Sequence, residues 1–252
     1  VARSVAAAGD LNKDGYADFA AGAPGFDVNV YDLISVGAVY VWYGSSSGPS
    51  ADPSWSAYGD QYLQQMGYSL SGAGDVDGNT YPDLIVGSRR FSSTRILYSG
   101  GAHVFENSGG MLNAAPSRVY SGPSSNSGFG MSVAGVGDLN DDGYADVSVG
   151  TPYCDGLTDN NEGCVFVYLG SVIGVSGEET WLGWGVKADS EYGMSVNGAG
   201  DVNGDGYDDL IVGAPIFKWD GQTPLGKVAV YHGAFAEANP YYCLSYLPVV
   251  IH

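Results

Sequence analysis

The stretch that decides the fold is Asp201-Val202-Asn203-Gly204-Asp205-Gly206-Tyr207-Asp208-Asp209, which runs directly into Leu210-Ile211-Val212-Gly213-Ala214-Pro215. Oxygen-bearing side chains stand at the first, third, fifth and ninth places of this nine-residue loop, and a glycine stands at the sixth. Together with the backbone carbonyl of the seventh residue, they supply the six or so oxygens that Ca²⁺ prefers. Mg²⁺ fits less well, because it demands stricter octahedral geometry and keeps its waters.

The loop occurs four times, with first aspartates at positions 10, 75, 138 and 201, which are 65, 63 and 63 residues apart. A fixed period of this size indicates supersecondary units that share a core. We therefore expect up to four Ca²⁺ sites, one in each repeat. Their ligands are the side chains of the first, third, fifth and ninth places and the carbonyl of the seventh: Asp10, Asn12, Asp14, Tyr16, Asp18; Asp75, Asp77, Asn79, Tyr81, Asp83; Asp138, Asn140, Asp142, Tyr144, Asp146; Asp201, Asn203, Asp205, Tyr207, Asp209.

The loop of the second repeat departs from the other three. Its glycine comes early, at Gly78, and Thr80 occupies the sixth place. A left-handed backbone is usually needed at the sixth place, and a β-branched residue resists that conformation. We expect this site to be the weakest of the four.

The loops are not EF-hands. The twelfth place, which holds a bidentate Glu in an EF-hand, is Ala21, Val86, Val149 or Val212, and a strand pattern follows in place of a helix. In an alternative interpretation, the aspartates only cap turns through hydrogen bonds from their side chains to the backbone. Three carboxylates so close together would repel one another without a cation, which favours bound ions. A fully chelated ion has little room to activate water, so we expect a structural role.

The sequence pattern of each repeat predicts four short strands. The first follows a segment of the form aromatic or apolar residue, Gly, any residue, Ser, as in Phe129-Gly130-Met131-Ser132. The second is almost wholly apolar, which indicates burial on both faces, the third alternates, and the fourth is weaker. Such units are typical of propeller blades. We predict an all-β chain, a single β-propeller domain over residues 1–252, with four-stranded antiparallel blades at about 1–65, 66–128, 129–191 and 192–252.

This series of motifs resembles the FG-GAP repeats of the integrin α-subunit β-propeller and its bacterial relatives. The resemblance rests on Phe-Gly-x-Ser, on Gly-Asp-x-Asn-x-Asp-Gly-Tyr-x-Asp-Leu-x-Val-Gly-Ala-Pro and on Gly-x-Val-x-Val-Tyr, and it reaches about Gly233. It implies that each calcium loop joins the first and second strands of a blade, on the face opposite the one that family members often use for ligands. The best-known members have seven blades. Three arrangements therefore stay open: a closed ring of four blades, two chains in one larger ring, or a piece of a longer protein.

The chain is strongly acidic, with 28 Asp and Glu against 9 Lys and Arg and a formal net charge of −19. Nucleic acid and anionic membranes are poor partners for such a surface. No run is long enough for a transmembrane helix and no secretion signal is present; since the chain starts inside a repeat, at Val1, we expect a trimmed product. Calcium sites of the millimolar range suit an extracellular protein, either secreted or on a cell surface. In that compartment Cys154 and Cys164 are expected to form a disulfide, and Cys243 to be a buried apolar residue.

Catalytic residues are not expected. Ser69, Ser132 and Ser195 recur from repeat to repeat, which favours a structural hydrogen-bonding role over that of a nucleophile. His103 and His232 occupy third-strand positions, where packing is the usual role. The main hypothesis is a calcium-binding adhesion module for protein or glycan ligands. A dimer or filament, built through open blade edges and the apolar tail at 240–252, is the second hypothesis, and an enzyme acting on polysaccharide is the third.

Ligand binding is expected on the variable loops between the second and third strands, because a rigid ring holds these loops together on one face. Exposed aromatic residues beside polar groups suit carbohydrate or protein ligands. Three of the nine basic residues cluster in the second repeat. Such a cluster is usually solvated charge; in a chain of net charge −19 the alternative is that it docks on an acidic loop of a neighbouring blade or subunit. The candidate residues are Phe26, Tyr31, Arg89, Arg90, Arg95, Asp159, Phe217 and Trp219. In the alternative, Phe217 and Trp219 pack between blades.

Overall fold

The computed structural model describes residues 2–28, 34–155, 161–218 and 223–234, and the backbone of 244–247. The regular structure of these residues consists of strands, which form four antiparallel sheets of four strands each. Within the same ranges, no helix has the length and apolar composition needed to cross a membrane. The all-β class and the four-stranded antiparallel units are thus confirmed.

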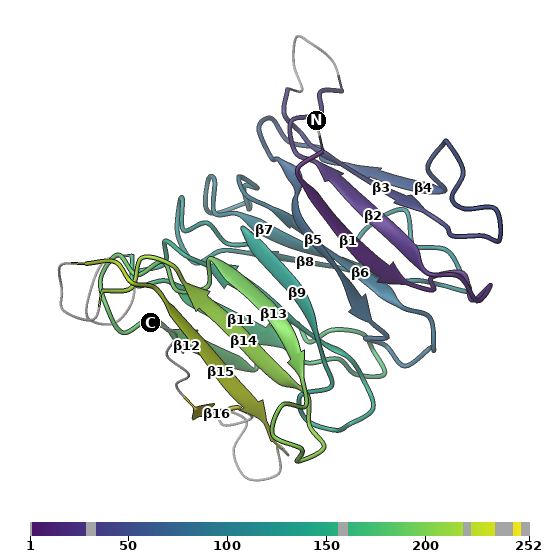
Figure 1. The fold of residues 1–252 in the computed structure, drawn as a ribbon. Coiled ribbons are helices and arrows are strands. Elements are labelled where there is room, and N and C mark those ends of the chain that lie inside the picture. Colours follow the sequence, from purple (N-terminus) through teal and green to yellow (C-terminus); the bar gives the residue numbers. More distant parts are fainter. Residues whose placement is uncertain (1, 29–33, 156–160, 219–222, 235–243, 248–252) are drawn as a thin grey trace.

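Each repeat forms one sheet, and its strands follow one another in chain order (Figure 1). The first sheet contains β1 (Ser4–Gly9), β2 (Asp18–Ala23), β3 (Ala38–Trp42) and β4 (Trp55–Tyr58). The second contains β5 (Met66–Gly74), β6 (Asp83–Ser88), β7 (Gly101–Phe105) and β8 (Arg118–Ser121). The third contains β9 (Ser132–Gly137), β10 (Asp146–Thr151), β11 (Cys164–Tyr168) and β12 (Trp181–Trp184). The fourth contains β13 (Ser195–Gly200), β14 (Asp209–Ala214), β15 (Lys227–Gly233) and β16 (Leu244–Leu247).

The sequence predicts a four-stranded blade over about 192–252 and, in the second hypothesis, an apolar tail at 240–252 that pairs with another chain. In the structure β16 pairs with β15 in antiparallel register, with Leu247 opposite Val230 and Leu244 opposite Gly233. This part of the tail therefore takes the outer position of the fourth sheet. Cys243 and the remainder of the tail lie outside the described residues.

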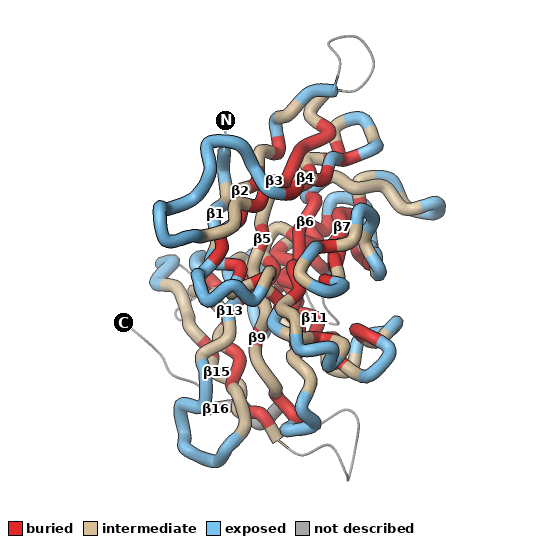
Figure 2. Tube along the Cα trace, turned by 90° about the vertical axis from the view of Figure 1, so that its right-hand side faces the viewer, coloured by how far each residue is buried: buried red, intermediate tan, exposed pale blue. Residues whose placement is uncertain are grey.

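Neighbouring sheets pack through their first strands, β1 on β5, β5 on β9 and β9 on β13. Three apolar cores lie between the sheets. The first joins residues such as Val41 and Leu84, the second Val104 and Val147, and the third Val167 and Leu210. Figure 2 shows that buried segments lie along the strands, among them β6 and β7. The near-continuous apolar runs of β6 and β10 are explained by this arrangement, since both faces of each strand are buried.

Glycines allow the backbones of neighbouring sheets to touch. A Cβ on Gly22, Gly87 or Gly150, at the Gly of each Gly-Ala-Pro position, would collide with the carbonyl oxygen of Gly67, Gly130 or Gly193 in the following repeat. Each of these three partner glycines also has a positive φ, between 76° and 84°. The aromatic-Gly-x-Ser segment of one repeat therefore docks against the Gly-Ala-Pro segment of the repeat before it.

The sheets form an open array in the described part of the chain, because β1 and β13 do not pack on each other as the other first strands do. The two end faces are correspondingly exposed. Val202 is 55% exposed, whereas its counterparts Leu11, Val76 and Leu139 are completely buried under the next sheet. At the other end, Val5 is 76% exposed. A closed ring of four blades is therefore not formed by the described residues.

We predict that Gly87→Ala destabilises the chain by about 1–3 kcal/mol, because the added methyl group must displace backbone of the neighbouring sheet. Gly213→Ala is the matched control. Gly213 holds the same position in the fourth sheet, and its Cβ would find Ser195 Cβ at an ordinary 3.5 Å as its nearest described neighbour. Thermal unfolding of both variants by circular dichroism checks this prediction. A control as unstable as Gly87→Ala would contradict it.

Candidate calcium loops and ligand face

The backbone of each loop begins at a β-bulge. In β1, β5, β9 and β13 the strand register shifts at the glycine that precedes the first aspartate. These glycines have left-handed φ values: Gly9, Gly74, Gly137 and Gly200. Such a bulge bends the strand out of the ladder and is accessible to glycine at little cost. This explains why Gly precedes Asp in every copy.

Two further places of each loop are left-handed. The fourth places are Lys13, Gly78, Asp141 and Gly204, and the sixth places are Gly15, Thr80, Gly143 and Gly206. Thr80 thus adopts the backbone that its β-branched side chain resists, with φ of 78°. A non-glycine residue in this region stores on the order of 1 kcal/mol of strain or more.

The first aspartate organises the turn through its carboxylate. Asp138 Oδ1 accepts the N–H of Asp142 at 3.1 Å, and its Oδ2 accepts the N–H of Gly143 at 2.8 Å. The fifth residue continues the pattern, since Asp142 Oδ1 accepts the N–H of Tyr144 at 3.0 Å. The turn-capping contacts that the alternative interpretation required are therefore present. They occupy only part of the acceptor capacity, because each carboxylate oxygen has two lone pairs.

The ninth aspartate is a buried clamp that recurs in all four repeats. Asp146 Oδ2 accepts the N–H of Leu139, the second loop residue, at 2.8 Å, and its Oδ1 accepts the N–H of Gly170 after the third strand at 2.9 Å. Asp18, Asp83 and Asp209 make the equivalent pairs of bonds. The ninth residue therefore ties the loop to the end of the third strand. The sequence showed these aspartates, but this partner 24 or 26 residues downstream was not predicted.

Burial dominates the electrostatics of the clamp. It raises the pKa of Asp146 to about 8 and that of Asp83 to about 7, despite the backbone hydrogen bonds that favour the charged form. The aspartates at the first place and nearby in each loop add to the rise. The exposed Asp201 differs, because the N–H groups of Gly206, Gly204 and Asp205 hold its pKa below the usual value. A cation beside the buried aspartates would favour their charged forms.

The donor set fits a hard cation. Carboxylate oxygens of Asp75, Asp77 and Asp83 all lie within 4.8 Å of one another, which matches two opposed Ca–O bonds of 2.3–2.6 Å. Two buried oxygens at predicted ligand positions, Asp75 Oδ1 and Asn140 Oδ1, have no hydrogen-bond partner among the described residues. Buried polar atoms are rarely left without a partner. The residues present therefore suit Ca²⁺, which would supply positive charge and a fixed loop geometry.

Blade two combines opposite features. We expected its site to be the weakest, and Thr80 is indeed in a left-handed conformation, yet among the described residues its loop holds the cluster of three carboxylates. The cluster includes the third place because that residue is Asp77, whereas the other loops have Asn there. The relative strength of the four sites stays a prediction.

Comparison with known proteins agrees with these motifs. The chain matches the profile of the FG-GAP repeat over residues 1–42, 129–168 and 192–231, and the second repeat lies outside these segments. It is 35% identical to integrin alpha-7 of Homo sapiens over 161 residues, which are 62% of this chain and 13% of that protein. The chain contains FG-GAP repeats.

Two further relatives extend the comparison of this FG-GAP chain. Integrin alpha-5 of Xenopus laevis is 28% identical over 216 residues, 82% of the chain and 19% of that protein. Integrin alpha-PS2 of Drosophila melanogaster is 45% identical over 96 residues, 35% of the chain and 6% of that protein. The FG-GAP chain thus spans less than a fifth of the length of these relatives.

The recurring serines of the FG-GAP chain link neighbouring repeats. Ser4 Oγ donates to the carbonyl of Gly67 at 2.8 Å, and Ser69 Oγ donates to that of Gly130 at 2.9 Å. Ser132 Oγ accepts the N–H of Val196 at 2.9 Å. These contacts are those of the structural role that their recurrence indicates. His103 is buried beside the ring of Phe91, and burial lowers its pKa to about 4, so it packs as a neutral side chain.

The candidate ligand residues of the FG-GAP chain divide into several groups. Phe26 packs against the rings of Tyr40 and Tyr58. Phe217 is buried in the core between the third and fourth sheets, so its ring is not presented to a ligand. Tyr31, Asp159 and Trp219 lie outside the described residues, and Arg95 is exposed.

Arg89 and Arg90 line a hollow of about 260 Å³ at the junction of the second and third sheets. Its other walls are Asn126, Gly128 and Tyr153. These residues come from the β6–β7 loop, the β8–β9 connection and the β10–β11 loop, at the end of the sheets opposite the calcium loops. Three separate stretches of sequence therefore build one polar concavity.

Aromatic rings hold both guanidinium groups. Arg89 lies over the ring of Tyr68 at 5.4 Å and Arg90 over that of Tyr98 at 5.2 Å. Arg3 covers the Tyr68 ring at 3.5 Å. Neither Arg89 nor Arg90 forms an ion pair with a carboxylate in the part of the chain that the structure describes. The expectation that they dock on an acidic loop of a neighbouring blade is not met among these residues.

Cys154 and Cys164 form the expected disulfide, with a Cα–Cα distance of 5.8 Å. Both are buried, and the bond closes the β10–β11 loop beside Tyr153. It thereby restrains one wall of the hollow.

We predict that two aspartates of one loop respond differently to calcium. Asp146→Ala removes the clamp and leaves the buried N–H groups of Leu139 and Gly170 unpaired, so it should cost about 2–4 kcal/mol even in EDTA. Asp142→Ala should cost about 1 kcal/mol or less in EDTA and more in millimolar Ca²⁺, because it removes mainly a cation ligand. Chemical denaturation in both buffers measures these values. A calcium-independent effect of Asp142→Ala would contradict the assignment.

Proposed function

We propose that this chain is a calcium-stabilised extracellular binding module of β-propeller type, without catalytic activity, whose loop face binds a protein ligand. The observation that carries the proposal is the hollow at Arg89 and Arg90. These two guanidinium groups are oriented by aromatic rings and have no carboxylate partner among the described residues, in a chain of net charge −19.

The chemistry of the hollow indicates an acidic group on the ligand. Arginine pairs with carboxylates through parallel N–H donors, and such charge-assisted bonds are stronger than neutral ones. Tyr153 and Asn126 add a phenol and an amide beside the two cations. The cation–π contacts leave the guanidinium edges free to donate. An aspartate or glutamate side chain of a protein ligand suits this site, and an acidic glycan is the second candidate of the same charge.

The relatives support the same class of function. The proteins that match the chain are named integrin alpha subunits, and the FG-GAP match includes the third repeat, which contributes Tyr153 to the hollow. Calcium in the loops would stiffen the end of each sheet that lies opposite the hollow. A stiffer sheet keeps the ligand loops at its other end in fixed positions. Integrin alpha subunits also support an extracellular or cell-surface location for this chain.

Binding to extracellular-matrix proteins and glycans on an array tests this proposal. The double variant Arg89→Gln/Arg90→Gln should weaken binding to the recognised ligand at least tenfold, because it removes both cations of the hollow. Arg95→Gln is the matched control, since it deletes one neighbouring positive charge outside the hollow and should change Kd less than twofold. Failure of the intact chain to bind any member, or equal losses in both variants, would refute the site.

Removal of calcium is a separate test. A cation that binds only the folded chain stabilises it by mass action, by about 2.7 kcal/mol for a site at one hundred times its Kd. EDTA should therefore lower Tm by several degrees, and added Ca²⁺ should restore it. Mg²⁺ at the same concentration should restore less. A Tm that is the same with and without chelator would rule out structural calcium.

A further inference from the structure

A cavity of about 390 Å³ lies at the junction of the first and second sheets, beside their outer strands β4 and β8. Its lining comes from β4, the β4–β5 connection, the start of β5, the β6–β7 loop, β7, and the β7–β8 connection with β8. We call it the outer cavity. It shares no lining residue with the hollow at Arg89 and Arg90, so it is a separate site.

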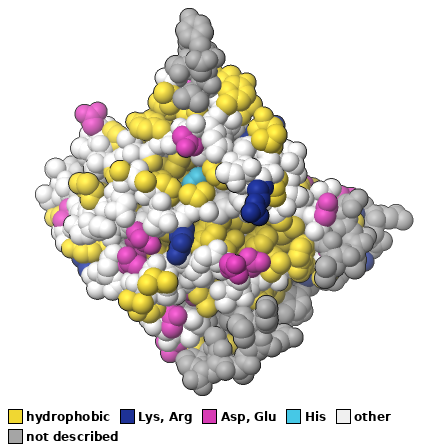
Figure 3. All heavy atoms as spheres, turned by 180° about the vertical axis from the view of Figure 1, so that it is seen from behind, with side chains coloured by type: hydrophobic (Ala, Val, Ile, Leu, Met, Phe, Trp, Pro, Cys, Tyr) yellow, Lys and Arg dark blue, Asp and Glu magenta, His cyan; other side chains and the backbone are white. Residues whose placement is uncertain are grey.

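Aromatic and aliphatic side chains form most of the walls of the outer cavity. The ring of Phe91 is perpendicular to the imidazole of His103, with the ring centroids 5.2 Å apart. Phe105 lies two residues further along β7, on the same face of the strand, and is buried. Figure 3 views the molecule from the side of the outer strands and shows a histidine among hydrophobic side chains. A mostly apolar cavity of this size, with few polar groups, is typical of a small-molecule site.

His103 supplies a buried polar atom to the outer cavity. The residue is only 4% exposed, and its Nε2 atom forms no hydrogen bond with any described residue. Burial lowers the pKa of His103 to about 4, so its imidazole is neutral near pH 7. Buried polar atoms are normally hydrogen-bonded. A hydroxyl group of a ligand can both donate and accept, so it matches this nitrogen in either tautomer of the ring.

Two glutamines fix the shape of the outer cavity. Gln64 is buried, and its Oε1 accepts the N–H of Asp60 at 2.8 Å and that of Gln61 at 3.1 Å. The side chain of Gln61 reaches the second sheet, where it accepts the N–H of Ser92 at 2.8 Å and donates to the Ser92 carbonyl at 3.1 Å. The β4–β5 connection is therefore tied to the β6–β7 loop, and the cavity is preformed.

Asp60 adds a carboxylate to the exposed edge of the outer cavity. It is an exposed residue of the lining, and it forms no ion pair in the part of the chain that the structure describes. In a chain of net charge −19, such a carboxylate attracts a cation. The outer cavity thus combines apolar walls, a hydrogen-bonding nitrogen at its buried side and a negative charge at its edge.

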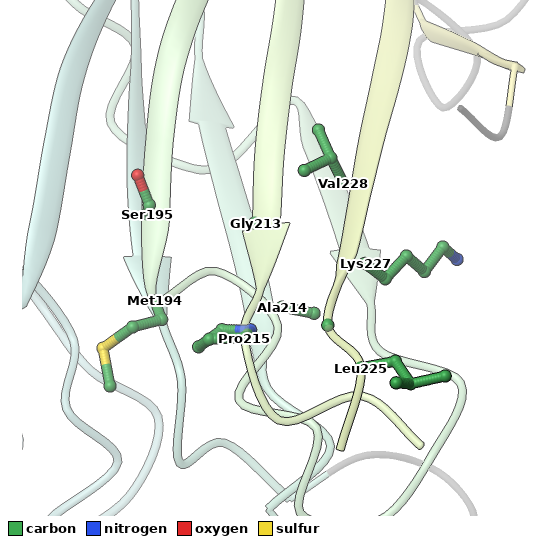
Figure 4. A pocket seen from close by; sticks show the side chains of 9 residues that line it. Met194, Ser195, Gly213, Ala214, Pro215, Leu225, Lys227 and Val228 are labelled. Atoms are coloured by element: carbon green, nitrogen blue, oxygen red, sulfur yellow. The ribbon is translucent and has the colours of Figure 1, made fainter. Parts of the chain in front are cut away.

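Other hollows of the molecule lack this combination. A cavity of about 520 Å³ lies on the fourth sheet, with Met194, Pro215 and Leu225 in its walls (Figure 4). No side chain of its lining has a buried polar atom without a partner among the described residues. The same holds for the hollow at Arg89 and Arg90. Of these three hollows, the outer cavity is the one with a polar atom that calls for a ligand.

We propose that the outer cavity binds a small phenolic amine. The aromatic ring of the ligand packs on Phe91 and Phe105, its hydroxyl group forms a hydrogen bond with His103, and its ammonium group lies beside Asp60. Each of the three chemical features of the cavity then has one counterpart in the ligand. The site is independent of calcium and of the hollow at Arg89 and Arg90.

Tyramine is the probe, because it carries a phenol and an ammonium group on one small molecule. Amide chemical shifts of the intact chain are followed during titration, and we expect saturable shifts centred on Phe91, His103 and Phe105. Two compounds each lack one feature: 2-phenylethylamine has no hydroxyl group and p-cresol has no ammonium group. Each should bind about fivefold more weakly than tyramine or worse, because each loses one hydrogen bond or charge pair.

Two variants assign the contacts. His103→Phe keeps a planar ring and removes Nε2, so it should weaken tyramine binding about fivefold and leave the affinity for 2-phenylethylamine unchanged. Asp60→Asn should weaken the binding of both amines and leave that of p-cresol unchanged. Asp52→Asn is the matched control, because it removes another exposed carboxylate of the first repeat that does not line the cavity. It should change none of the three affinities. An unchanged Tm checks the fold of each variant.

Several results would overturn the proposal. One is the absence of saturable shifts at the outer cavity with tyramine. Another is equal affinity of the intact chain for tyramine and both partial compounds, which would show that His103 and Asp60 recognise nothing. Equal effects of Asp60→Asn and Asp52→Asn would show attraction by net charge alone. Shifts centred on Asn126 and Tyr153 would place the amine in the other hollow and would contradict the assignment.

Discussion

Direct backbone contact between neighbouring sheets, where the second strand of one sheet meets the segment before the first strand of the next, is the constraint on which the structure depends. At each interface two glycines, such as Gly87 and Gly130, meet at a distance that leaves no room for a Cβ on either. Side chains of β6 and β9 can then interdigitate on both sides of this contact at the density of a protein interior. An added methyl group on either glycine would force the backbone of one of the two sheets to shift locally. The glycines of the repeat therefore set the spacing of the sheets, beyond their usual role in turns.

The buried aspartate at the ninth place is the second constraint, and it acts at the calcium end. This aspartate, which is Asp146 in the third repeat, fixes the loop to the end of the third strand of its own sheet. Backbone bonds then connect adjacent loops, because Ala145 N–H donates to the carbonyl of Asp75 at 2.9 Å and Asp208 N–H to that of Asp138 at 3.1 Å. A cation in one loop would thus stiffen a chain of loops. The glycine contacts lie near the opposite end of the sheets, where Gly22, Gly87 and Gly150 are next to the last residue of the second strands.

Much of this architecture follows from the sequence, because its signals are local and repeated. The period of the aspartates, the alternation of residues 164–168 and the apolar run at 210–215 determine which strands form and how they pair. The loop conformation could also be predicted from the sequence, since the glycines mark its left-handed positions and Thr80 could be identified as the exception. Contacts between residues distant in the sequence could not be predicted. Nothing near Asp146 indicates Gly170, and nothing near Arg89 indicates that Tyr153 completes a hollow with it.

Phe217 shows why ligand residues were the hardest part to predict. An aromatic residue in a variable loop has the same local pattern whether it faces solvent or the core, and here burial between two sheets decided its role. The two arginines are different, because burial of a charged side chain that has no carboxylate partner costs free energy. Their hollow is built from the second and third sheets, which have neighbours on both sides in this array. The end faces contribute nothing to its walls, so the proposed ligand site does not depend on what lies beside the first or the fourth sheet.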